Sequence, residues 1–353
     1  MKSIFFLALL ALVQIPLNSF AAKMFPNSLG DKDFFVTQLK FPKAAKALAA
    51  ESCRENIART VCLVDPIPDH ENLGARICLE GGQAYAKYFE NLYDRYPPAL
   101  QKMFCSLRHI YIEKKMAGTA YAGLNRDTNG NPDGALMGVR KSVLDEELDL
   151  NTWATWKEQL SFGGGNSYRN PLPTLPTITS FNSAGTSDFL YFVITHEFGH
   201  IFDFANNLNQ TQNCTTPVDK TQQPECEMVP GSWGSISWAT SQKAKPENEF
   251  PLRKYLCFYW CNGQTIAHND VLNVYSGLAD TDFISLYATS QAWDDFADSL
   301  AYYLSYKNLG ASYSIDTKQG PSYDIMEKLH APIFAKKREY IERFLERSDI
   351  VYP

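Results

Sequence analysis

The chain has 353 residues, of which 45% are hydrophobic and 20% are charged, and its formal net charge at pH 7 is −6. These values are typical of a globular protein with a sizeable core, and the length suits one large domain or a catalytic domain with a smaller companion. Because the acidic excess is mild and the sequence has no basic stripe, nucleic acid is not expected as a partner.

Residues 1–21 form a predicted signal peptide. Lys2 supplies a short positive segment, residues 4–17 form an apolar run, and S-F-A at residues 19–21 offers the small residues that signal peptidase requires. Cleavage is therefore expected near Ala21. Because no later run approaches the ~20 apolar residues of a membrane span, the mature protein is expected to be secreted or periplasmic, without stable membrane insertion.

Residues 22–105 are predicted to form a mostly helical region that packs against the rest of the chain. Apolar residues recur at helical spacing between residues 41 and 48 and again between residues 84 and 89. The cysteines of this region favour a folded unit that is retained in the mature protein. An inhibitory prodomain is the alternative.

Eight cysteines in a chain expected to be exported indicate disulfide bonds. Four of them precede residue 196 and four follow it, which predicts two separately cross-linked regions. A zinc site built from cysteines is the alternative, but no C-x-x-C pair supports it. The eight residues are Cys53, Cys62, Cys78, Cys105, Cys214, Cys226, Cys257 and Cys261.

Short alternating or apolar runs between residues 109 and 144 are typical of strands. The runs are H-I-Y-I-E, G-T-A-Y-A-G-L and G-A-L-M-G-V-R-K-S-V-L, and the turn-rich N-R-D-T-N-G-N-P-D-G separates the last two. A calcium loop of the EF-hand type is the alternative for this turn. Counted from Asp127, however, Pro132 stands where that loop requires glycine. A small sheet with a hairpin turn is therefore expected.

A Gly- and Pro-rich loop then leads to T-I-T-S-F at residues 177–181, which is a predicted edge strand, and to a long apolar helix. Thr186 or Ser187 is expected to cap this helix. Asp188 suits its first turn because a carboxylate there faces the positive end of the helix.

Two later segments are expected at the surface. Residues 206–226 are polar and of low complexity, which predicts a surface loop held by cysteines. The basic run at residues 336–338, K-K-R, lies in a charged helical pattern and is expected to form a solvated face.

The apolar helix contains T-H-E-F-G-H-I-F-D-F at residues 195–204, where His196 and His200 stand four apart and Glu197 follows the first histidine. Residues at this spacing share a helix face, so both imidazoles can aim at one point. Zn²⁺ accepts two such nitrogens and retains positions for a third ligand and a water, whose proton Glu197 can accept. Two ordinary core histidines beside a costly buried glutamate are the alternative. Asp203 is expected to support the ligands, because three ligands from one short helix would crowd the metal.

A third ligand of the predicted catalytic zinc ion is expected from residues 285–304, S-L-Y-A-T-S-Q-A-W-D-D-F-A-D-S-L-A-Y-Y-L. Asp294 and Asp298 stand four apart on one helix face. Asp294 can bind the metal, while Asp298 can hold a ligating histidine through the other nitrogen of its ring. Asp295 is the alternative ligand.

These two segments resemble the gluzincin metallopeptidases, and within them the lethal-factor-like peptidases, the group that includes the protease domain of anthrax lethal factor. The pattern of that group is Tyr, six residues, Glu, any residue, and Phe-Ala-Glu. Tyr287, Phe296 and Ala297 match it, and Asp294 and Asp298 stand at its two acidic positions. Because aspartate is one methylene shorter than glutamate, the second helix is expected to approach the metal more closely.

The resemblance implies an α+β, zincin-like catalytic domain over residues 106–353, with a small twisted sheet above the active-site helix and a mostly helical lower half. It also implies a zinc metalloendopeptidase that acts on peptide or protein substrates. In that reaction zinc activates a water, Glu197 acts as general base, and zinc with Tyr287 stabilises the oxyanion. The substrate backbone would pair with T-I-T-S-F or A-L-M-G-V.

Two other functions are consistent with the same residues. One is a zinc hydrolase that acts on a non-protein or crosslinked substrate, such as a cell wall. The other is a catalytically silent binding module of the same fold. The H-E-x-x-H motif supplies water activation and not specificity, so it does not separate these possibilities.

Overall fold

The computed structural model describes residues 53–353, except for residues 66–76, 117, 128, 130, 166–167, 169, 183–184, 216–223 and 259–265. The predicted signal peptide at residues 1–21 and the predicted helix at residues 41–48 lie outside the described residues. The described chain is a mixed α+β structure with small sheets, which confirms the predicted α+β class. In the part of the chain that the structure describes, no helix is both long and apolar enough to cross a membrane.

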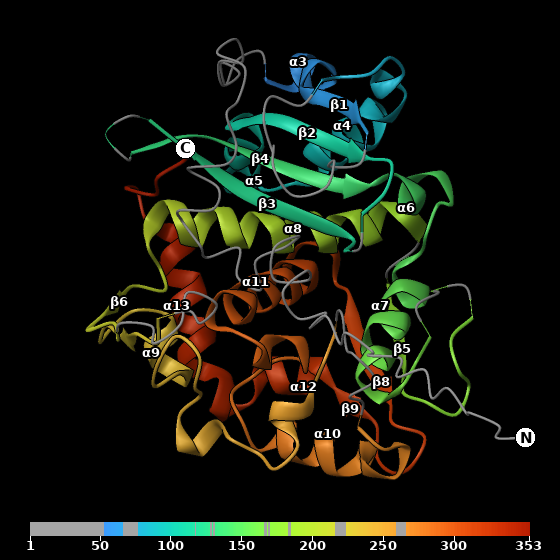
Figure 1. Ribbon diagram of the computed structural model, residues 1–353, viewed down its shortest axis with the longest axis vertical. Helices are drawn as coiled ribbons and strands as arrows, with labels where there is room; N and C mark the ends of the chain where they lie inside the picture. Colours follow the sequence, from blue (N-terminus) through green and yellow to red (C-terminus); the bar gives the residue numbers. More distant parts are fainter. Residues whose placement is uncertain are drawn as a thin grey trace, which may run out of the picture.

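A four-stranded sheet forms the upper part of the molecule (Figure 1), with the strand order β1-β2-β4-β3. The strands are β1 (Val61–Val64), β2 (Leu107–Glu113), β3 (Ala120–Arg126) and β4 (Pro132–Arg140). β1, β2 and β4 are parallel, and β3 runs antiparallel to β4 at one edge of the sheet. The strands predicted between residues 109 and 140 are therefore confirmed.

The turn between β3 and β4 is the predicted hairpin turn. The Asp127 carboxylate accepts the backbone N–H groups of Asn129 and Asn131, each at 2.8 Å. The backbone N–H of Asp127 donates to the carbonyl oxygen of Asn131 at 2.9 Å. A side chain that bonds to its own backbone in this way stabilises a turn.

The described part of the segment predicted to be mostly helical is mostly helical, and it also contains the strand β1, whose four residues are all buried. Its sequence V-C-L-V is a short apolar run without helical spacing, which suits a covered strand in a parallel pair. Residues Lys141–Asp145 form the short helix α6 instead of continuing the strand before them.

Three helices accompany β1 at the upper end of the molecule, namely α3 (Cys53–Thr60), α4 (Ala86–Arg95) and α5 (Pro98–Cys105) (Figure 1). Their buried side chains belong to the same hydrophobic core as those of the sheet and the central helices. The segment before residue 105 therefore contributes both a strand and core side chains to the rest of the fold.

Three disulfide bonds join described cysteines. They are Cys53–Cys105, Cys62–Cys78 and Cys214–Cys226, and Cys257 is also disulfide-bonded. None of the three pairs connects a cysteine before the H-E-x-x-H motif with one after it, which agrees with the prediction of two separately cross-linked regions. Because these cysteines are oxidised, they are not available to hold a zinc ion.

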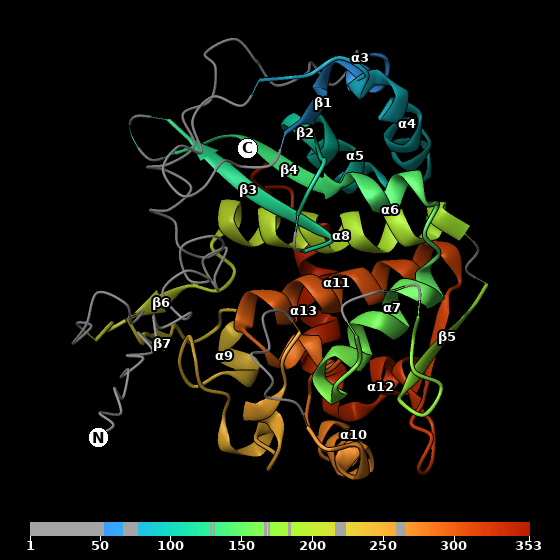
Figure 2. The same cartoon turned by 45° about the vertical axis from the view of Figure 1, so that its right-hand side comes forward.

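Two long helices cross below the sheet. In both views α8 (Gly185–Asn206) lies next to β3, and α11 (Ala292–Leu309) lies on the opposite side of α8 (Figures 1 and 2). Every residue of α8 from Asp188 to Asp203 is buried. A helix that is covered on all sides is expected to be apolar around its circumference, which explains the apolar run at residues 189–194. The polar side chains that follow it, among them His196, Glu197 and His200, are the exceptions that need a reason.

The beginning of α8 differs from the expectation. The helix starts at Gly185, so Thr186 and Ser187 lie inside its first turn and do not precede it as caps. Asp188 lies in the first turn, as predicted, and its carboxylate is paired with the guanidinium of Arg95 in α4.

The lower half of the molecule, as far as the structure describes it, contains further helices and a three-stranded antiparallel sheet with the order β5-β8-β9 (Figure 2). The elements are α7 (Leu150–Gln159), α10 (Val271–Ala279), α12 (Ile325–His330), α13 (Ala335–Glu346), β5 (Thr177–Phe181), β8 (Ser312–Asp316) and β9 (Tyr323–Asp324). T-I-T-S-F forms β5 at the edge of this sheet, as predicted. A-L-M-G-V lies in β4, which is paired with β2 on one side and β3 on the other. The prediction that this segment could bind the substrate backbone is therefore wrong, because its main-chain hydrogen bonds are already made.

The segment after α8 contains the short pair β6 (Thr211–Gln212) and β7 (Glu227–Met228), followed by α9 (Gly234–Ser237). The Cys214–Cys226 bond joins the chain after β6 to the chain before β7. Of the predicted surface loop, residues 210–215 are exposed, and residues 216–223 lie outside the described residues. After β7 the chain returns to the interior of the molecule, where Trp233 and Trp238 are fully buried.

Candidate metal centre

The two central helices bring five predicted site residues together. α8 contributes His196, Glu197 and His200, and α11 contributes Asp294 and Asp298. All five are buried, and His200 is only 1% exposed. The sites on α11 are separated from those on α8 by almost one hundred residues, so the fold and not the local sequence determines their proximity.

His196, His200 and Asp294 form a group that could hold a metal ion. One nitrogen or oxygen atom from each lies within 4.8 Å of the others. The His200 Nε2 atom lies 3.1 Å from His196 Nε2 and 3.6 Å from Asp294 Oδ1. A tetrahedral ion with bonds of 2.0–2.1 Å separates its ligand atoms by about 3.3 Å. The observed distances therefore fit one small ion between the three side chains.

Asp298 supports the first histidine. Its Oδ1 atom lies 2.7 Å from His196 Nδ1, and the hydroxyl of Ser285 donates to its Oδ2 atom at 2.5 Å. A carboxylate at Nδ1 favours the tautomer that carries the proton there, which leaves the lone pair of Nε2 directed toward His200 and Asp294. The predicted relation between Asp298 and a ligating histidine is present.

Gly199 and Ala297 allow the two helices to approach closely. A Cβ atom added at Gly199 would lie 2.6 Å from the Cα atom of Ala297, which no ordinary packing contact permits. A larger residue at position 199 would therefore push α11 away from α8. This close contact is consistent with the expectation that a short aspartate needs a nearer helix than a glutamate would.

Burial and mutual repulsion give the site a strong preference for a cation. Burial, followed by repulsion from Asp294, raises the pKa of Glu197 to about 8. Burial, followed by repulsion from Asp298, raises the pKa of Asp294 to about 7. Within the described residues, the Oε2 atom of Glu197 is buried without a hydrogen-bond partner. A divalent cation at this position would relieve both the repulsion and the desolvation of the carboxylates.

The histidines are poised in the neutral form that metal binding requires. Burial, followed by the neighbouring His196, holds the pKa of His200 well below its usual range. Burial also lowers the pKa of His196, although Asp298 opposes that shift. For Asp298, burial is outweighed by the attraction of Lys157 and by contacts with His196 and Ser285, so that its pKa falls to about 2.

Tyr287 lies beside the three candidate ligands, in a short 3₁₀ helix (Tyr287–Thr289) just before α11. The centroid of its ring is 5.7 Å from that of His196. Burial and the charge of Asp298 raise the pKa of Asp294, and the charge of Lys157 opposes this rise. Hydrogen bonding, including that of the Tyr287 hydroxyl, opposes the rise to a smaller extent. The position agrees with the role that the resemblance implies.

Lys157 is a site residue that the sequence analysis missed. It comes from α7, and its Nζ atom lies 3.4 Å from the centroid of the Tyr287 ring. Only the tertiary fold brings α7 to this position, because K-E-Q at residues 157–159 carries no metal-binding spacing. The unusual feature of Lys157 is that it is buried, because most lysines are exposed. Burial of a single lysine cannot be read from one sequence.

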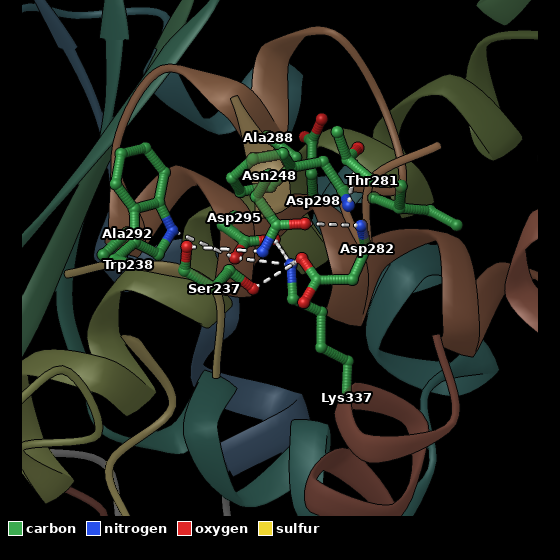
Figure 3. Close-up of polar contacts among 12 residues, drawn as sticks. Ser237, Trp238, Asn248, Thr281, Asp282, Ala288, Ala292, Asp295, Asp298 and Lys337 are labelled. Atoms are coloured by element: carbon green, nitrogen blue, oxygen red, sulfur yellow. Dashed lines mark hydrogen bonds and ion pairs between the residues drawn. The ribbon is translucent and has the colours of Figure 1, made fainter. Parts of the chain in front are cut away.

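Asp295, the alternative third ligand, points to the other side of α11. Both of its carboxylate oxygens accept hydrogen bonds of 2.7 Å from Lys337 Nζ, and the indole N–H of Trp238 donates at 3.2 Å. Figure 3 shows the Lys337 ammonium between the carboxylates of Asp282 and Asp295. Asp294, and not Asp295, therefore lies with the two histidines in the group that could hold a metal ion.

The predicted solvated face at residues 336–338 is wrong for its central residue. Lys337 is fully buried, whereas Lys336 is exposed. The Lys337 Nζ atom also lies 3.1 Å from Asp282, so one ammonium is shared by two acidic side chains. A lysine can be buried in this way only because both its charge and its N–H groups are satisfied.

Asp203 is placed at the end of α8. Its carboxylate accepts the backbone N–H and the side-chain amide of Asn209, each at 2.8 Å. The Asn209 amide also donates to the carbonyl oxygen of Ala292 at 3.3 Å. Through Asn209, Asp203 therefore links the end of α8 with the first residue of α11. It can support the ligands only indirectly, by holding α11 in place.

The comparisons with known proteins offer no relative. No family model matches the chain, and neither a curated protein nor a solved structure matches it.

Proposed function

We propose that this protein is a zinc-dependent metalloendopeptidase in which His196, His200 and Asp294 bind the zinc ion. The observation that carries the proposal is the buried group of two imidazoles and one carboxylate, with Glu197 on the same turn of α8. This arrangement supplies metal ligands and a neighbouring proton acceptor in one enclosed place.

The donor set favours zinc over other common ions. Calcium and magnesium prefer sites made entirely of oxygen atoms, whereas two neutral imidazoles and one carboxylate suit zinc. Three protein ligands leave one tetrahedral position for water or substrate, which distinguishes a catalytic site from a structural one. When bound, zinc would polarise the substrate carbonyl and lower the pKa of a coordinated water toward ~7.

Glu197 is suited to move the proton. Its carboxyl group is buried on the same turn of α8 as the two histidines, and a bound zinc ion would favour the ionised form that can accept a proton. It would accept a proton from the attacking water and deliver it to the leaving amine. The hydroxyl of Tyr287 would donate a hydrogen bond to the carbonyl oxygen as negative charge develops there.

Two edge strands are candidates for binding the substrate backbone: β5, which the sequence analysis suggested, and β3, which it did not. β5 ends its sheet, and β3 ends the upper sheet on the side of α8 (Figure 2). A peptide that adds to such an edge gains main-chain hydrogen bonds without sequence specificity. Of the two, β3 is the strand that the views place next to the metal-binding helix, so we assign the substrate to its edge.

We also propose that the protein works outside the cytoplasm. The disulfide bonds among the described cysteines are consistent with an oxidising compartment. The sequence features of residues 1–21 agree with export.

The proposal is tested by metal analysis together with cleavage of a peptide library. The wild-type protein should bind one zinc ion and hydrolyse peptides, and a chelator should abolish hydrolysis until zinc is restored. Glu197→Gln should keep the zinc and lose nearly all turnover, whereas Glu339→Gln, at an exposed position on α13, should behave as wild type. A zinc-loaded wild-type protein that cleaves no peptide, or an active Glu197→Gln variant, would refute the proposal.

A further inference from the structure

We propose that Lys157 is a positioning residue of this site: its ammonium holds the Tyr287 ring in place and puts a positive charge beside the metal-binding group. The inference rests on the proposed function, because it concerns the residue that would bind the oxyanion. Neither the H-E-x-x-H motif nor the segment around Asp294 contains it.

The position of Lys157 is built into the fold. Asp149 caps α7 by accepting the backbone N–H of Thr152 at 3.0 Å. One turn before Lys157, the indole N–H of Trp153 donates to Thr119 at 2.8 Å, which ties α7 to the end of the upper sheet. The Lys157 Nζ atom lies 5.1 Å from the Trp153 ring centroid and 3.4 Å from that of Tyr287. The ammonium is therefore held over two aromatic faces.

The Tyr287 ring is confined from a second direction. Phe258 meets it edge to face, with ring centroids 5.0 Å apart. A cation over the face of an aromatic ring is attracted by the negative charge of that face, and the attraction is stronger where water is excluded. Lys157 is only 8% exposed. Its ammonium and the Phe258 ring thus restrict the directions in which the Tyr287 hydroxyl can point.

Lys157 also brings a positive charge to the site. Its Nζ atom lies 3.4 Å from the centroid of the Tyr287 ring, and that centroid is 5.7 Å from the centroid of the His196 ring. The ammonium therefore lies close to the place between His196, His200 and Asp294 where the proposed zinc ion would bind.

The role makes a prediction that simple structural support does not make. An ammonium near the metal repels it, so neutral Lys157→Met should bind zinc more tightly than wild type, by at least about threefold. At the same time its kcat should fall roughly 10- to 30-fold with little change in KM, because the oxyanion donor is held less well. A residue that only supported the fold would weaken zinc binding when removed.

The experiment measures zinc affinity by competition with a chromophoric chelator, and kcat and KM on a peptide substrate, for a set of variants of the full chain. Lys157→Arg keeps the positive charge and should restore most of kcat and the wild-type zinc affinity. Lys307→Met removes an exposed lysine that lies 5.3 Å from the Tyr303 ring centroid on the last turn of α11, and it should change neither quantity. In a Tyr287→Phe background, Lys157→Met should cause no further fall in kcat beyond about twofold.

The outcomes separate the two proposals. An inactive Glu197→Gln variant beside a fully active Lys157→Met variant with unchanged zinc affinity would overturn only the role of Lys157. Additive losses in the Tyr287→Phe background, or weaker zinc binding by Lys157→Met, would overturn it as well. If wild type bound zinc but cleaved no peptide, the proposed function would fail, and tighter zinc binding by Lys157→Met would still support the position of the ammonium beside the metal.

Discussion

The two faces of α11 carry the same residue type in two different roles. Asp294 and Asp295 are adjacent aspartates, both are buried, and burial raises the pKa of each to about 7. Asp294 faces the two histidines of α8, whereas Asp295 faces Lys337 and Trp238. One step along a helix turns a side chain by about 100°, so each aspartate meets a different set of neighbours.

The partner decides the role of each carboxylate. Asp295 already has a permanent cation from α13, and its pair stabilises the position of α11. Asp294 lies beside the His200 imidazole instead of an ammonium, so a metal ion bound between the two side chains would supply its direct compensating charge. The comparison predicts that changes on the Lys337 face alter the stability of the fold, and that changes on the histidine face alter metal binding.

The largest expected effect comes from Lys337→Met. The substitution leaves the buried carboxylates of Asp282 and Asp295 without their shared ammonium, which should lower the free energy of unfolding by about 3–5 kcal/mol. Chemical denaturation of the metal-free protein measures this loss. Lys336→Met, the exposed neighbour, should stay within about 0.5 kcal/mol of wild type. Equal stabilities of the two variants would contradict the division between the faces.

Asp294→Asn should produce the opposite pattern. Loss of the carboxylate ligand is expected to weaken zinc binding by at least about 100-fold, while the metal-free fold should be as stable as wild type or more so, because a buried charge has been removed. Zinc titration and denaturation of the apo protein measure the two quantities. Asp280→Asn, at the exposed end of α10, is the matched control. Unchanged zinc binding by Asp294→Asn would show that the histidine face of α11 does not bind the metal through Asp294.

Asp298→Asn should have a smaller effect on the same face. The variant loses the carboxylate that holds His196 Nδ1, and such supporting groups typically contribute 10- to 100-fold to metal affinity. Zinc should therefore still bind, but about 10- to 100-fold more weakly. A variant that binds zinc as tightly as wild type would exclude the proposed support of His196.

The smallest expected effect is on the pH dependence of stability, and it concerns Glu158, another buried carboxyl group. Burial raises the pKa of Glu158 from 4.5 to about 7, although Tyr275 donates a hydrogen bond to it and Lys157 attracts it. Between these two pKa values the folded protein holds a proton that the unfolded chain has released, so stability falls as pH rises, by at most about 1.4 kcal/mol per pH unit.

Glu158→Gln removes this titration. Its free energy of unfolding should fall less than that of wild type between pH 5 and pH 7, as measured by urea denaturation at several pH values. Parallel curves for the two proteins would show that Glu158 does not titrate in this range.

The sequence predicted which side chains lie together at this site better than it predicted their surroundings. The spacing of His196, Glu197 and His200 predicts a shared helix face because i and i+4 positions always coincide on a helix. The same rule placed Asp294 and Asp298 together on α11. The tyrosine and the Phe-Ala pair came from the resemblance, and Gly199 shows why the alanine matters, since it faces that glycine across the helix contact.

The residues that the sequence did not reveal act through long-range contacts. Lys337 lies in a charged run and was expected in solvent, yet two acids from other segments make its burial possible. Lys157 has no motif at all and reaches Tyr287 only because α7 packs beside α8. Likewise, β1 has too few residues to show a period, and its pairing with β2 decides its conformation. In each case the determining partner is distant in sequence.

The most direct test of the central claim is X-ray absorption at the zinc edge on protein loaded with one equivalent of zinc. We predict two imidazole nitrogens at ~2.0–2.1 Å and carboxylate or water oxygens at ~2.0–2.2 Å, with no sulfur ligand. The imidazole signal should disappear in a His196→Ala, His200→Ala double variant. A sulfur shell, or an unchanged spectrum in that variant, would contradict the account.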